Sequence, residues 1–537
     1  MLGEVIRDLP ENIQNYIQTL EKKNAGQESR IQDLESSHNR LEKRVEILQE
    51  KLRLALFKKF GRSSEKIDPS QGELFSEAEE ESDLLESAEE KTTTVPSYKR
   101  KKAGRKPLDP NIPREDILHD LSDEEKICGC GAVLSKIDEE IREELEIIPE
   151  QVFVKRHIYP RYACRNCEGS GDEGKPTFRS ARAPARFLPG SIVSPSLLAF
   201  VLVNKFTDHL PFYRQEKRFE RIGAQISRQD MSNWTINAYK TLKSLEELFV
   251  EKIKEGPFIQ MDETPLQVMK ERERPDTRRS YMWLARGGPP DAPLVYYRYH
   301  PTREAAFVKD FLTGYSGFLQ TDGYAAYDSA LKGRTDIVHV GCLAHVRRRF
   351  HDAAKATKKA GGAHIGLKKI QGIYHAEQEL HKDPLEAEEL LKLREKHVKP
   401  LLEDFRMWLE DKVLKIRPSS LFGKAVSYAL NEWSKISQYV ESPHLSPDNN
   451  AAERSIKPFV MGRKNWLFSG SPRGADASCF FYSMIETAKV NNLNPYGYLK
   501  WVFETAPVVG KAEYESLLPW NCDRESVNEF GFTSWGN

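Results

Sequence analysis

Apolar residues recur with a period of 3.5 residues through the first part of the chain. The two seam positions of each heptad can be assigned throughout this stretch: one is occupied by Ile13, Leu20, Gln27, Leu34, Leu41, Leu48 and Ala55, and the other by Ile17, Asn24, Ile31, His38, Val45 and Leu52. An apolar seam among Glu, Lys and Arg side chains predicts a coiled coil over residues 1–62 and a homodimer formed through it. The alternative is one long amphipathic helix that folds back on its own protein.

The heptad pattern is lost after residue 62, and charge dominates the next segment. Residues 63–97 are rich in Glu and poor in branched apolar residues, which predicts an acidic disordered linker. The charge then changes sign in a basic arm, YKRKKAGRKP, whose cations are Lys99, Arg100, Lys101, Lys102, Arg105 and Lys106. Such a run suits a phosphate backbone or a narrow minor groove of DNA, and a solvated tether is the alternative.

Two cysteine pairs lie within residues 98–185, where short strands and turns are predicted. Cys128-x-Cys130 and Cys164-x-x-Cys167 offer four thiolates, the ligand set that Zn²⁺ prefers in a tetrahedral structural site. The first pair is one residue shorter than the usual knuckle. We therefore expect a zinc-binding module, with free thiols or a substitute ligand such as His119 as the alternatives.

Residues 186–256 have a helical pattern. RQEKRFERI, Gly223 and SRQDMSNWTINAYKTL predict a helix, a turn and a second helix, with Ser227 as the N-cap and Asp230 in the capping-box position. This segment is expected to bind DNA, and the pair could read it as a helix-turn-helix. It could equally be a plain helical hairpin with a core made of Phe219, Ile222, Trp234 and Ile236.

Strand-like periodicity replaces the helical pattern from Pro257 onward. FIQMDETPLQVM, SYMWLARG, LVYYRYH and GFLQTDGYAAY predict strands, and IVHVGCLAHVRRRFHDA predicts a strand followed by a helix. The following residues are charged and helical, and a helix-led pattern returns near the C-terminus. The expected fold is a multidomain α/β protein, with a core over residues 257–353 and 445–510, a helical insertion over 354–444 and a tail over 511–537.

Composition narrows the class of protein. The 537 residues are 39% hydrophobic and 30% charged, and the mean hydropathy is −0.61, which excludes a wholly disordered chain and a membrane protein. Lys+Arg and Asp+Glu both number 81, so net charge indicates no partner. The first residues have no secretory pattern, and seven cysteines, four of them in close pairs, favour a reducing cytoplasm and a metal site over disulfides.

Two aspartates occur where a charge is unexpected. Asp262 in IQMDETP is expected at the end of an apolar strand, and Asp322 in FLQTDGY repeats the arrangement, with Gly323 permitting a close approach. A carboxylate that projects from the rigid end of a strand is a good ligand for a hard cation such as Mg²⁺.

A third candidate acid, Glu453, lies in SPDNNAAERSIKP. Ser446 can cap a helix that has Pro447 at its first position, and Pro458 is expected to disrupt that helix, so Glu453 is expected about two turns from its start. The alternative is an ordinary surface pair with Lys457 at i,i+4. Spacing does not exclude four rival acids: Glu263, Asp328, Asp448 and Glu486.

These residue types together indicate one kind of chemistry. Two aspartates on neighbouring strands and one helical glutamate can hold two Mg²⁺ ions roughly 3.5–4 Å apart. Such a pair activates one oxygen and stabilises another in an in-line displacement at phosphorus. The alternative for each acid is a capping or salt-bridging role.

Several long motifs run along the chain: LFKKFGRSSEK, GRKPLDPNIPRE, LVNKFTDHLPFYRQ, QMDETP, QTDGYAAY, GCLAHVRRRF, NNAAERSIKPFVMGRKNWLFSGSPRGA and IETAKVNNLNPYGYL. In these motifs the chain resembles the transposases of the insertion sequence 66 family, a branch of the DDE transposases with a ribonuclease-H-like catalytic core. The resemblance covers nearly the whole chain. The Cys-x-Cys pair and the residues after Pro519 depart from the family pattern.

The resemblance implies a DNA transposase that binds the terminal inverted repeats of an insertion element, cleaves its ends and joins the 3′-OH to target DNA. It implies Asp262, Asp322 and Glu453 as catalytic residues and as ligands of Mg²⁺ or Mn²⁺. It also implies double-stranded DNA and accessory proteins of the element as partners, and a bacterial cytoplasm with the nucleoid as the location. The alternatives are a catalytically inactive zinc-containing DNA-binding regulator, and a nuclease with the same core but without strand transfer.

Cations and one aromatic residue follow the candidate glutamate. Arg454, Lys457, Arg463 and Lys464 are expected to contact phosphates near the cleaved bond, and Trp466 to pack or stack against an unpaired base. The alternative is that Trp466 belongs to the core and the cations form a solvated face.

A second basic cluster opens the helix predicted after IVHVG. His345, Arg347, Arg348 and Arg349 are expected to position DNA or the candidate acids, with packing as the alternative. Cys342-x-x-His345 offers only two metal ligands, which do not make a site.

Overall fold

The computed structural model describes residues 10–60, 152–163, 178–357 and 361–528 of the chain. The chain divides into two compact units, of which the first holds residues 1–86, 204–209 and 239–492. The second holds residues 87–203, 210–238 and 493–537. The paired cysteines, the acidic linker and the basic arm lie outside the described residues, so the expectations for them stay predictions.

A five-stranded mixed sheet forms the centre of the first unit. Its strands are β3 (Phe258–Gln267), β4 (Arg279–Gly287), β5 (Leu294–His300), β6 (Gly317–Gln320) and β7 (Ile337–Val340). They lie in the order β5-β4-β3-β6-β7, in which β5, β4 and β3 pair antiparallel, whereas β6 runs parallel to β3 and β7 parallel to β6. β3 is therefore the middle strand.

The middle strand extends beyond the point where the sequence pattern suggested an end. Parallel pairing of β3 with β6 stops at Gln260, but antiparallel pairing with β4 continues to Gln267 and places Asp262 opposite Leu284. The expectation that Asp262 ends a strand is therefore wrong, because it lies beyond the parallel pairing only. Pro265, which has no N–H to donate, is tolerated in β3 because β6 does not reach it.

One helix covers the edge strand β5. α17 (Pro472–Val490) runs beside this strand, and the hydroxyl of Thr487 accepts a hydrogen bond from Val295 N at 3.1 Å and donates one to Val295 O at 3.0 Å. Ser483 Oγ accepts a bond from Tyr297 N at 2.8 Å. These side chains satisfy backbone groups that an uncovered edge would leave open to other strands.

Further helices of the first unit lie near the sheet. They are α7 (Lys243–Lys254), α8 (Ala305–Phe311), α9 (Ala325–Leu331) and α16 (Asn450–Trp466), and α16 contacts both β3 and β4. The strand expected over GFLQTDGYAAY ends at Gln320, and its last residues begin α9 instead. The reason is local: Asp322 bonds the backbone N–H of Tyr324 and starts a turn into the helix.

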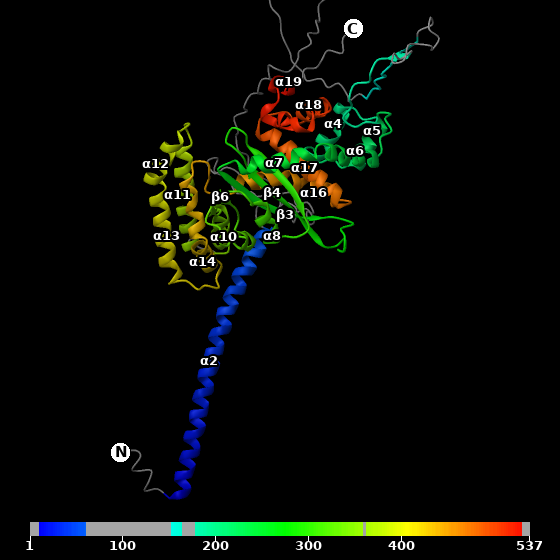
Figure 1. The fold of residues 1–537 in the computed structure, drawn as a ribbon. Helices are drawn as coiled ribbons and strands as arrows, with labels where there is room; N and C mark the ends of the chain where they lie inside the picture. The colour runs from blue at the N-terminus through cyan, green and yellow to red at the C-terminus, as the bar shows by residue number, and fades with distance from the viewer. Residues whose placement is uncertain (1–9, 61–151, 164–177, 358–360, 529–537) are drawn as a thin grey trace, which may run out of the picture. The chain divides into compact units, whose positions relative to one another are not determined.

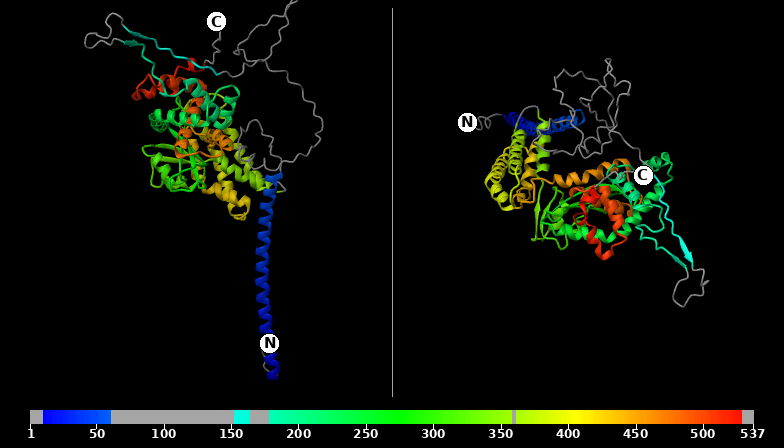
Figure 2. Two further views of the ribbon diagram at one scale, coloured as in Figure 1. Left: turned by 90° about the vertical axis from the view of Figure 1, so that its right-hand side faces the viewer. Right: turned by 90° about the horizontal axis from the view of Figure 1, so that it is seen from above.

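A set of helices is inserted between β7 and α16. It consists of α10 (Leu343–Lys355), α11 (Gly362–Leu380), α12 (Ala387–His397), α13 (Lys399–Val413), α14 (Leu421–Asn431), α15 (Trp433–Ile436) and the 3₁₀ turn η1 (Gln438–Glu441). Figures 1 and 2 show α11–α14 as a bundle of their own. Its core includes Phe350, Phe405 and Trp433. The described part of residues 354–444 contains no strand, as the sequence pattern indicates.

The second unit contains the helical pair. α4 (Pro195–Phe206) begins in this unit, followed by α5 (Phe212–Arg221) and the first part of α6 (Arg228–Thr241). The capping box is formed as expected: Asp230 N donates to Ser227 Oγ at 3.1 Å, and Ser227 N donates to Asp230 Oδ2 at 3.2 Å. Of the residues expected in the hairpin core, Phe219 and Trp234 are buried, Ile236 is half-buried and Ile222 is exposed.

The remaining elements of the second unit are short. They are β1 (Arg161–Ala163) and β2 (Phe178–Ser180), which form an antiparallel pair, and α18 (Pro495–Thr505), η2 (Lys511–Leu517), η3 (Pro519–Asn521) and α19 (Arg524–Asn528). β1 ends at the residue before Cys164. The described part of the C-terminal tail packs on α18, because Tyr498 donates a hydrogen bond to Leu517 O at 2.8 Å.

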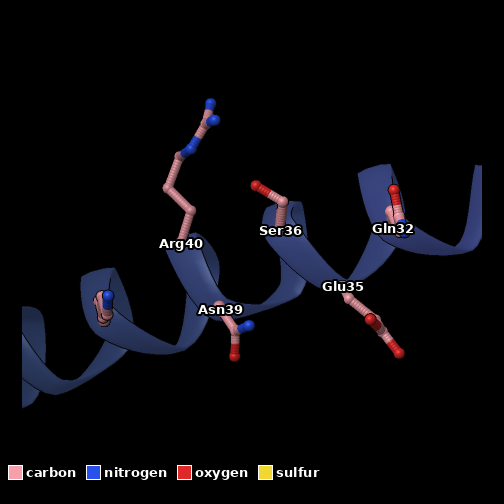
Figure 3. A pocket seen from close by; sticks show the side chains of 6 residues that line it. Gln32, Glu35, Ser36, Asn39 and Arg40 are labelled. Carbon is pink, nitrogen blue, oxygen red and sulfur yellow. The ribbon is translucent and has the colours of Figure 1, made fainter. Parts of the chain in front are cut away.

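The heptad segment forms a single helix, α2 (Glu11–Phe60). Its described seam residues are exposed, among them Leu34, Leu41 and Leu48. A shallow surface hollow on the same helix is lined by polar residues of non-seam heptad positions, and Figure 3 shows Ser36 and Arg40 pointing to one side and Glu35 and Asn39 to the other. Among the described helices, none is both long enough and apolar enough to cross a membrane.

Candidate active site

Asp262 and Asp322 occupy equivalent places beside two neighbouring parallel strands. The last paired residues of β3 and β6 are Gln260 and Gln320, and each aspartate follows its glutamine by two residues. Gln260 Nε2 donates a hydrogen bond to Gln320 Oε1 at 2.7 Å, so the two strands are joined directly before the acids. Equal offsets from paired residues put the two carboxylates at the same end of the parallel pair.

Glu453 reaches this place through the start of α16. The helix begins at Asn450, and Asn449 before it donates a hydrogen bond from Nδ2 to Met261 O at 2.9 Å. That bond attaches the N-terminal end of α16 to the residue before Asp262. Glu453 therefore lies in the first turn of a helix whose beginning is held against the middle strand, so the expectation that it lies about two turns from the helix start is wrong.

Three details of the expected α16 are wrong. Ser446 does not cap the helix, because its hydroxyl donates to Asp448 O at 2.7 Å, and Pro447 precedes the first turn. Asp448 Oδ1 instead accepts a bond from Asn450 N at 3.1 Å, which delays the helix start by three residues. Pro458 lies inside the helix without ending it, since Pro removes one backbone hydrogen bond and packing on β3 and β4 holds the rest.

The three carboxylates influence one another electrostatically. Burial raises the pKa of Asp262 well above its ordinary value, and the negative charges of Glu263, Glu453 and Asp322 raise it further. Like charges raise the pKa of a carboxyl group when they lie near it in a poorly solvated place. The three acids offer oxygen ligands, which a hard divalent cation such as Mg²⁺ prefers.

Glu453 also contacts the helix that follows β7. Arg348 Nη2 lies 3.6 Å from Glu453 Oε2, and His345 Nδ1 lies 3.9 Å from Glu453 Oε1. Ligand atoms of Cys342, His345 and Glu453 all lie within 4.8 Å of one another, so the fold adds a third member to the Cys-x-x-His pair.

This group has the donor set of a softer ion, but burial raises the pKa of the Cys342 thiol and so disfavours the thiolate that binds such an ion. Burial and the nearby Arg348 lower the pKa of His345 to about 4. Cys342 Sγ accepts a hydrogen bond from Asn449 N at 3.3 Å, directly before the helix of Glu453. We therefore read this group as a support for Glu453.

The four rival acids have other partners. Glu263 accepts bonds from Arg303 Nε at 2.6 Å and from the Tyr327 hydroxyl at 2.5 Å. The partners of the remaining three are as follows: Asp328 with His339 and Lys435, Asp448 with the backbone of Asn450, and Glu486 with Lys489. Each rival thus has a structural role that explains why an acid stands there.

The predicted DNA-contacting residues separate into two groups. Arg454, Lys464 and, in part, Lys457 are open to solvent on α16. Arg463 instead bonds Thr264 Oγ1 at 3.0 Å, and Trp466 packs edge-on against Phe459 with ring centroids 5.3 Å apart.

The basic cluster on α10 separates in the same way. Arg348 faces Glu453, Arg349 stacks on the ring of Tyr428 at 3.9 Å, and Arg347 is only 9% exposed. Arg347 therefore lies in the interior rather than at a surface that DNA would meet.

Sequence reasoning missed the buried amides that hold the site together. Asn449, Gln260 and Gln320 are all buried, and each bonds across elements that are far apart in sequence. Gln320 Nε2 also donates to Ser446 O at 2.8 Å, in the segment that leads to α16. The available signal was a polar residue inside an apolar strand two places before each aspartate.

The fold and the candidate acids indicate a class of protein. An α/β protein with one aspartate on the middle strand of a mixed sheet, a second aspartate after the neighbouring strand and a glutamate on the helix attached to the middle strand has residue types suited to divalent-cation chemistry on phosphate esters. A family model described as "Transposase IS66 family" matches residues 190–477, more than half of the chain. The chain belongs to the IS66 family of transposases.

Three further family models match other parts of the chain. The "zinc-finger binding domain of transposase IS66" matches residues 125–168, "Transposase C of IS166 homeodomain" matches 47–117, and the "IS66 C-terminal element" matches 483–520. The zinc-finger match includes both cysteine pairs and supports Zn²⁺ as the ion that they bind. The last match reaches the beginning of the tail.

The chain is also similar to proteins of Sinorhizobium fredii (strain NBRC 101917 / NGR234). It is 31% identical to "Uncharacterized protein y4jD" over 438 residues, covering 79% of this chain and 83% of that protein. It is 28% identical to "Uncharacterized protein y4hP" over 505 residues, covering 91% of this chain and 89% of that protein. A transposase role therefore rests on the family, and the finer mechanism is a matter for proposal.

Proposed function

We propose that this protein is a Mg²⁺- or Mn²⁺-dependent DDE transposase that binds the terminal inverted repeats of an insertion element, cleaves its ends and joins the 3′-OH to target DNA. The observation that carries the proposal is geometric: the Gln260–Gln320 bond joins the strands that precede Asp262 and Asp322, and the Asn449–Met261 bond attaches the start of the Glu453 helix beside Asp262. It ties three acids from distant parts of the chain to one place. The neighbouring rival Glu263 is instead bound by Arg303 and Tyr327.

The strand order supports a ribonuclease-H-like core. When its strands are numbered by their order along the chain, the sheet has the spatial order third, second, first, fourth and fifth strand. The first three strands pair antiparallel, and the fourth and fifth run parallel to the first. Asp262 lies on the first strand, Asp322 follows the end of the fourth strand by two residues, and the glutamate belongs to a helix after them. The helices between β7 and α16 then correspond to an insertion before the third acid.

The roles of the residues follow from their contacts. Asp262, Asp322 and Glu453 would hold the divalent cations, which when bound supply charge neutralisation and an activated oxygen at the phosphate. The bond between Gln260 and Gln320 keeps the two aspartates in register. Arg348 orients the glutamate through the attraction of opposite charges across 3.6 Å. No Ser, Tyr or His nucleophile is assigned, because the attacking groups are water and a DNA hydroxyl.

Recognition of the element's ends is assigned to the N-terminal half. The basic arm supplies phosphate contacts, the zinc module supplies a rigid platform, and the helical pair supplies base contacts. α6 exposes Arg228, Gln229 and Asn233 on its first turns, which are residue types that bond base edges in the major groove. We expect Asn233→Ala to weaken binding to the terminal repeat more than binding to unrelated DNA.

Self-association is assigned to the seam of α2. Leu34 and Leu41 are 62% and 59% exposed, which is unfavourable for large apolar side chains on an isolated helix. A second copy would bury the seam and bring two DNA ends together. Leu41→Lys should convert a dimer to a monomer in light scattering, and Asn39→Lys, on the polar side of the same helix, should not.

The decisive experiment measures strand joining with Mg²⁺. Asp262→Asn should abolish joining of a pre-cut element end to plasmid DNA while end binding is retained. Asp404→Asn, at an exposed position on α13, is the matched control and should join normally. Joining by Asp262→Asn at the normal rate would overturn the site. Cleavage of ends without joining by the unaltered protein would favour a nuclease, and binding without either reaction would favour a regulator.

A further inference from the structure

The residue after α16 adopts a rare backbone conformation. Leu467 has φ 64° and ψ −50°, and Phe468 N donates a hydrogen bond to Trp466 O at 2.8 Å across it. This is a three-residue γ-turn with positive φ, a conformation that is strained for residues other than glycine. Strain of this kind persists only where the surrounding structure imposes it, and it concentrates at functional places.

The turn is held on both sides. Leu467 N donates to Arg463 O at 2.7 Å, in the last turn of the helix. Ser469 N donates to Gln267 O at 2.9 Å, and Met269 N donates to Ser469 O at 2.9 Å, which joins the other side to the end of the middle strand. The turn is therefore a rigid projection from the same two elements that carry Asp262 and Glu453.

The projection presents two large apolar side chains to solvent. Leu467 is 64% exposed and Phe468 is 46% exposed, while Ser469 directly after them is buried. We call Leu467 and Phe468 the apolar tip. Exposing such a pair costs solvation free energy, and a backbone strained to expose it is not explained by packing within the described residues.

Charge on the adjoining helix indicates what covers the tip. Lys457 and Lys464 lie on the side of α16 that includes Glu453, and Arg454 lies next to Glu453 in the chain; all three are at least partly open to solvent. A row of cations from the candidate active site to the apolar tip is complementary to a phosphate backbone. A protein partner that covered only the tip would leave this row unexplained.

We propose that the apolar tip inserts into a base step of the duplex DNA end that lies in the candidate active site. This inference rests on the proposed function and adds the place where the protein distorts its substrate. Apolar side chains that enter a base step partly unstack it, and phosphate contacts on either side hold the DNA in place. The rigid turn supplies an edge that does not yield to the stacked bases.

The helix also sets where the distortion falls. Leu467 follows Glu453 by 467 − 453 = 14 residues, which along a helix is a rise of about 21 Å. At about 3.4 Å per base pair, this length corresponds to roughly six base pairs. For a duplex whose axis runs along α16, the tip acts about six base pairs from the phosphate that is cleaved or joined.

The test uses 2-aminopurine, whose fluorescence rises when it is unstacked. A duplex of the element's own terminal repeat, read from the DNA that flanks the gene, carries the probe at one position at a time. The full-length Asp262→Asn protein is used so that the DNA stays intact. We expect a severalfold rise in fluorescence at the predicted step and its loss in the combined variant Leu467→Gly and Phe468→Ser, with DNA affinity measured by anisotropy in parallel.

The variants separate the tip from the fold. Glycine accepts a positive φ, so Leu467→Gly keeps the turn while removing the side chain. Met461→Ser, at a 47% exposed apolar position on the same helix, is the matched control and should keep the rise. The insertion would be refuted if the double variant kept the full rise in fluorescence. It would also be refuted if the protein with the unaltered tip bound the duplex and gave no rise at any probe position. A change in oligomeric state without a change in fluorescence would reassign the tip to a protein contact, and a failure to bind the duplex at all would overturn the proposed function as well.

Discussion

Gln260 donates a side-chain hydrogen bond to Gln320 at 2.7 Å across two parallel strands, and both residues are buried. The bond lies two residues before each candidate aspartate. Gln320 in turn donates to Ser446 O at 2.8 Å, in the segment that precedes the helix of Glu453. The Gln320 amide thus connects the three segments that carry the acids. Its substitution tests whether these bonds assemble the site.

Replacing this amide should damage stability and activity together. Gln320→Leu keeps a similar volume but leaves the Gln260 amide and the Ser446 carbonyl without their partner. The expected loss is about 1–3 kcal/mol in the free energy of unfolding, measured in urea. Strand joining should fall more than binding to DNA. Gln371→Leu, at an exposed position on α11, should stay within about 0.5 kcal/mol. Equal losses for the two variants would contradict the assigned role.

A partly buried histidine should make stability depend on pH. His339 Nε2 lies 2.8 Å from Thr321 Oγ1 and its Nδ1 lies 3.0 Å from Asp328 Oδ1. Burial and the charge of Lys435 lower the pKa of His339 to about 4. As the pH falls from about 6.5 to about 4, the unfolded chain takes up this proton before the folded protein does, so stability is lost across that window.

The matching experiment is urea unfolding at a series of pH values. His339→Gln should remove a loss of up to about 3 kcal/mol between pH 6.5 and pH 4. His375→Gln, an exposed histidine on α11, serves as the control and should leave the loss unchanged. If both variants retained the wild-type slope, other groups would be responsible for it.

A glycine inside α16 should resist substitution. A Cβ at Gly462 would lie 2.6 Å from the Tyr482 hydroxyl and 2.9 Å from Trp466 Nε1, between two packed helices. Gly462→Ala should therefore lower stability by about 1–3 kcal/mol. Gly372→Ala on α11 meets no atom within 4 Å and should raise stability by about 0.5–1 kcal/mol. Thermal unfolding distinguishes the two, and a gain at both positions would refute the predicted clash.

A fully buried arginine joins the inserted helices to the segment before α16. Arg394 pairs with Glu377 at 2.9 Å and donates to Ser442 O at 2.7 Å and Leu445 O at 2.8 Å. Arg394→Met should cost about 3–5 kcal/mol, because it leaves the carboxylate buried and unpaired. Adding Glu377→Met should recover part of that loss in a double-mutant cycle. A double variant no more stable than Arg394→Met would show that the carbonyl bonds, and not the ion pair, dominate.

Much of the local structure could be predicted from periodicity and turn chemistry. The strand before Asp322, the capping box at Ser227 and the strand-to-helix order around Cys342 all follow from patterns within about ten residues. The start of α16 could not be predicted in this way. Ser446 has the right side chain for a cap, but its hydroxyl donates to Asp448 O, and Asp448 Oδ1 accepts the bond from Asn450 N at the helix start.

The candidate site could likewise be predicted only in part from the sequence. Spacing singled out three acids but left four rivals open, since sequence distance does not say which carboxylates meet. The rivals are explained only by partners such as Arg303 and Lys489, which lie on other turns or other elements. Likewise, nothing in the letters WLFSG reveals that Leu467 is strained and exposed.

The sequence by itself determined the elements, the cysteine spacing and the membership of a family, because helix and strand periods and turn residues act over a few neighbouring positions. The tertiary structure decided which distant groups meet: that α16 is attached to β3 through Asn449, that Arg347 is interior, and that the helix ends in a rigid apolar tip. These outcomes depend on packing between segments more than a hundred residues apart, such as Asp322 and Glu453, and no local pattern encodes such distances.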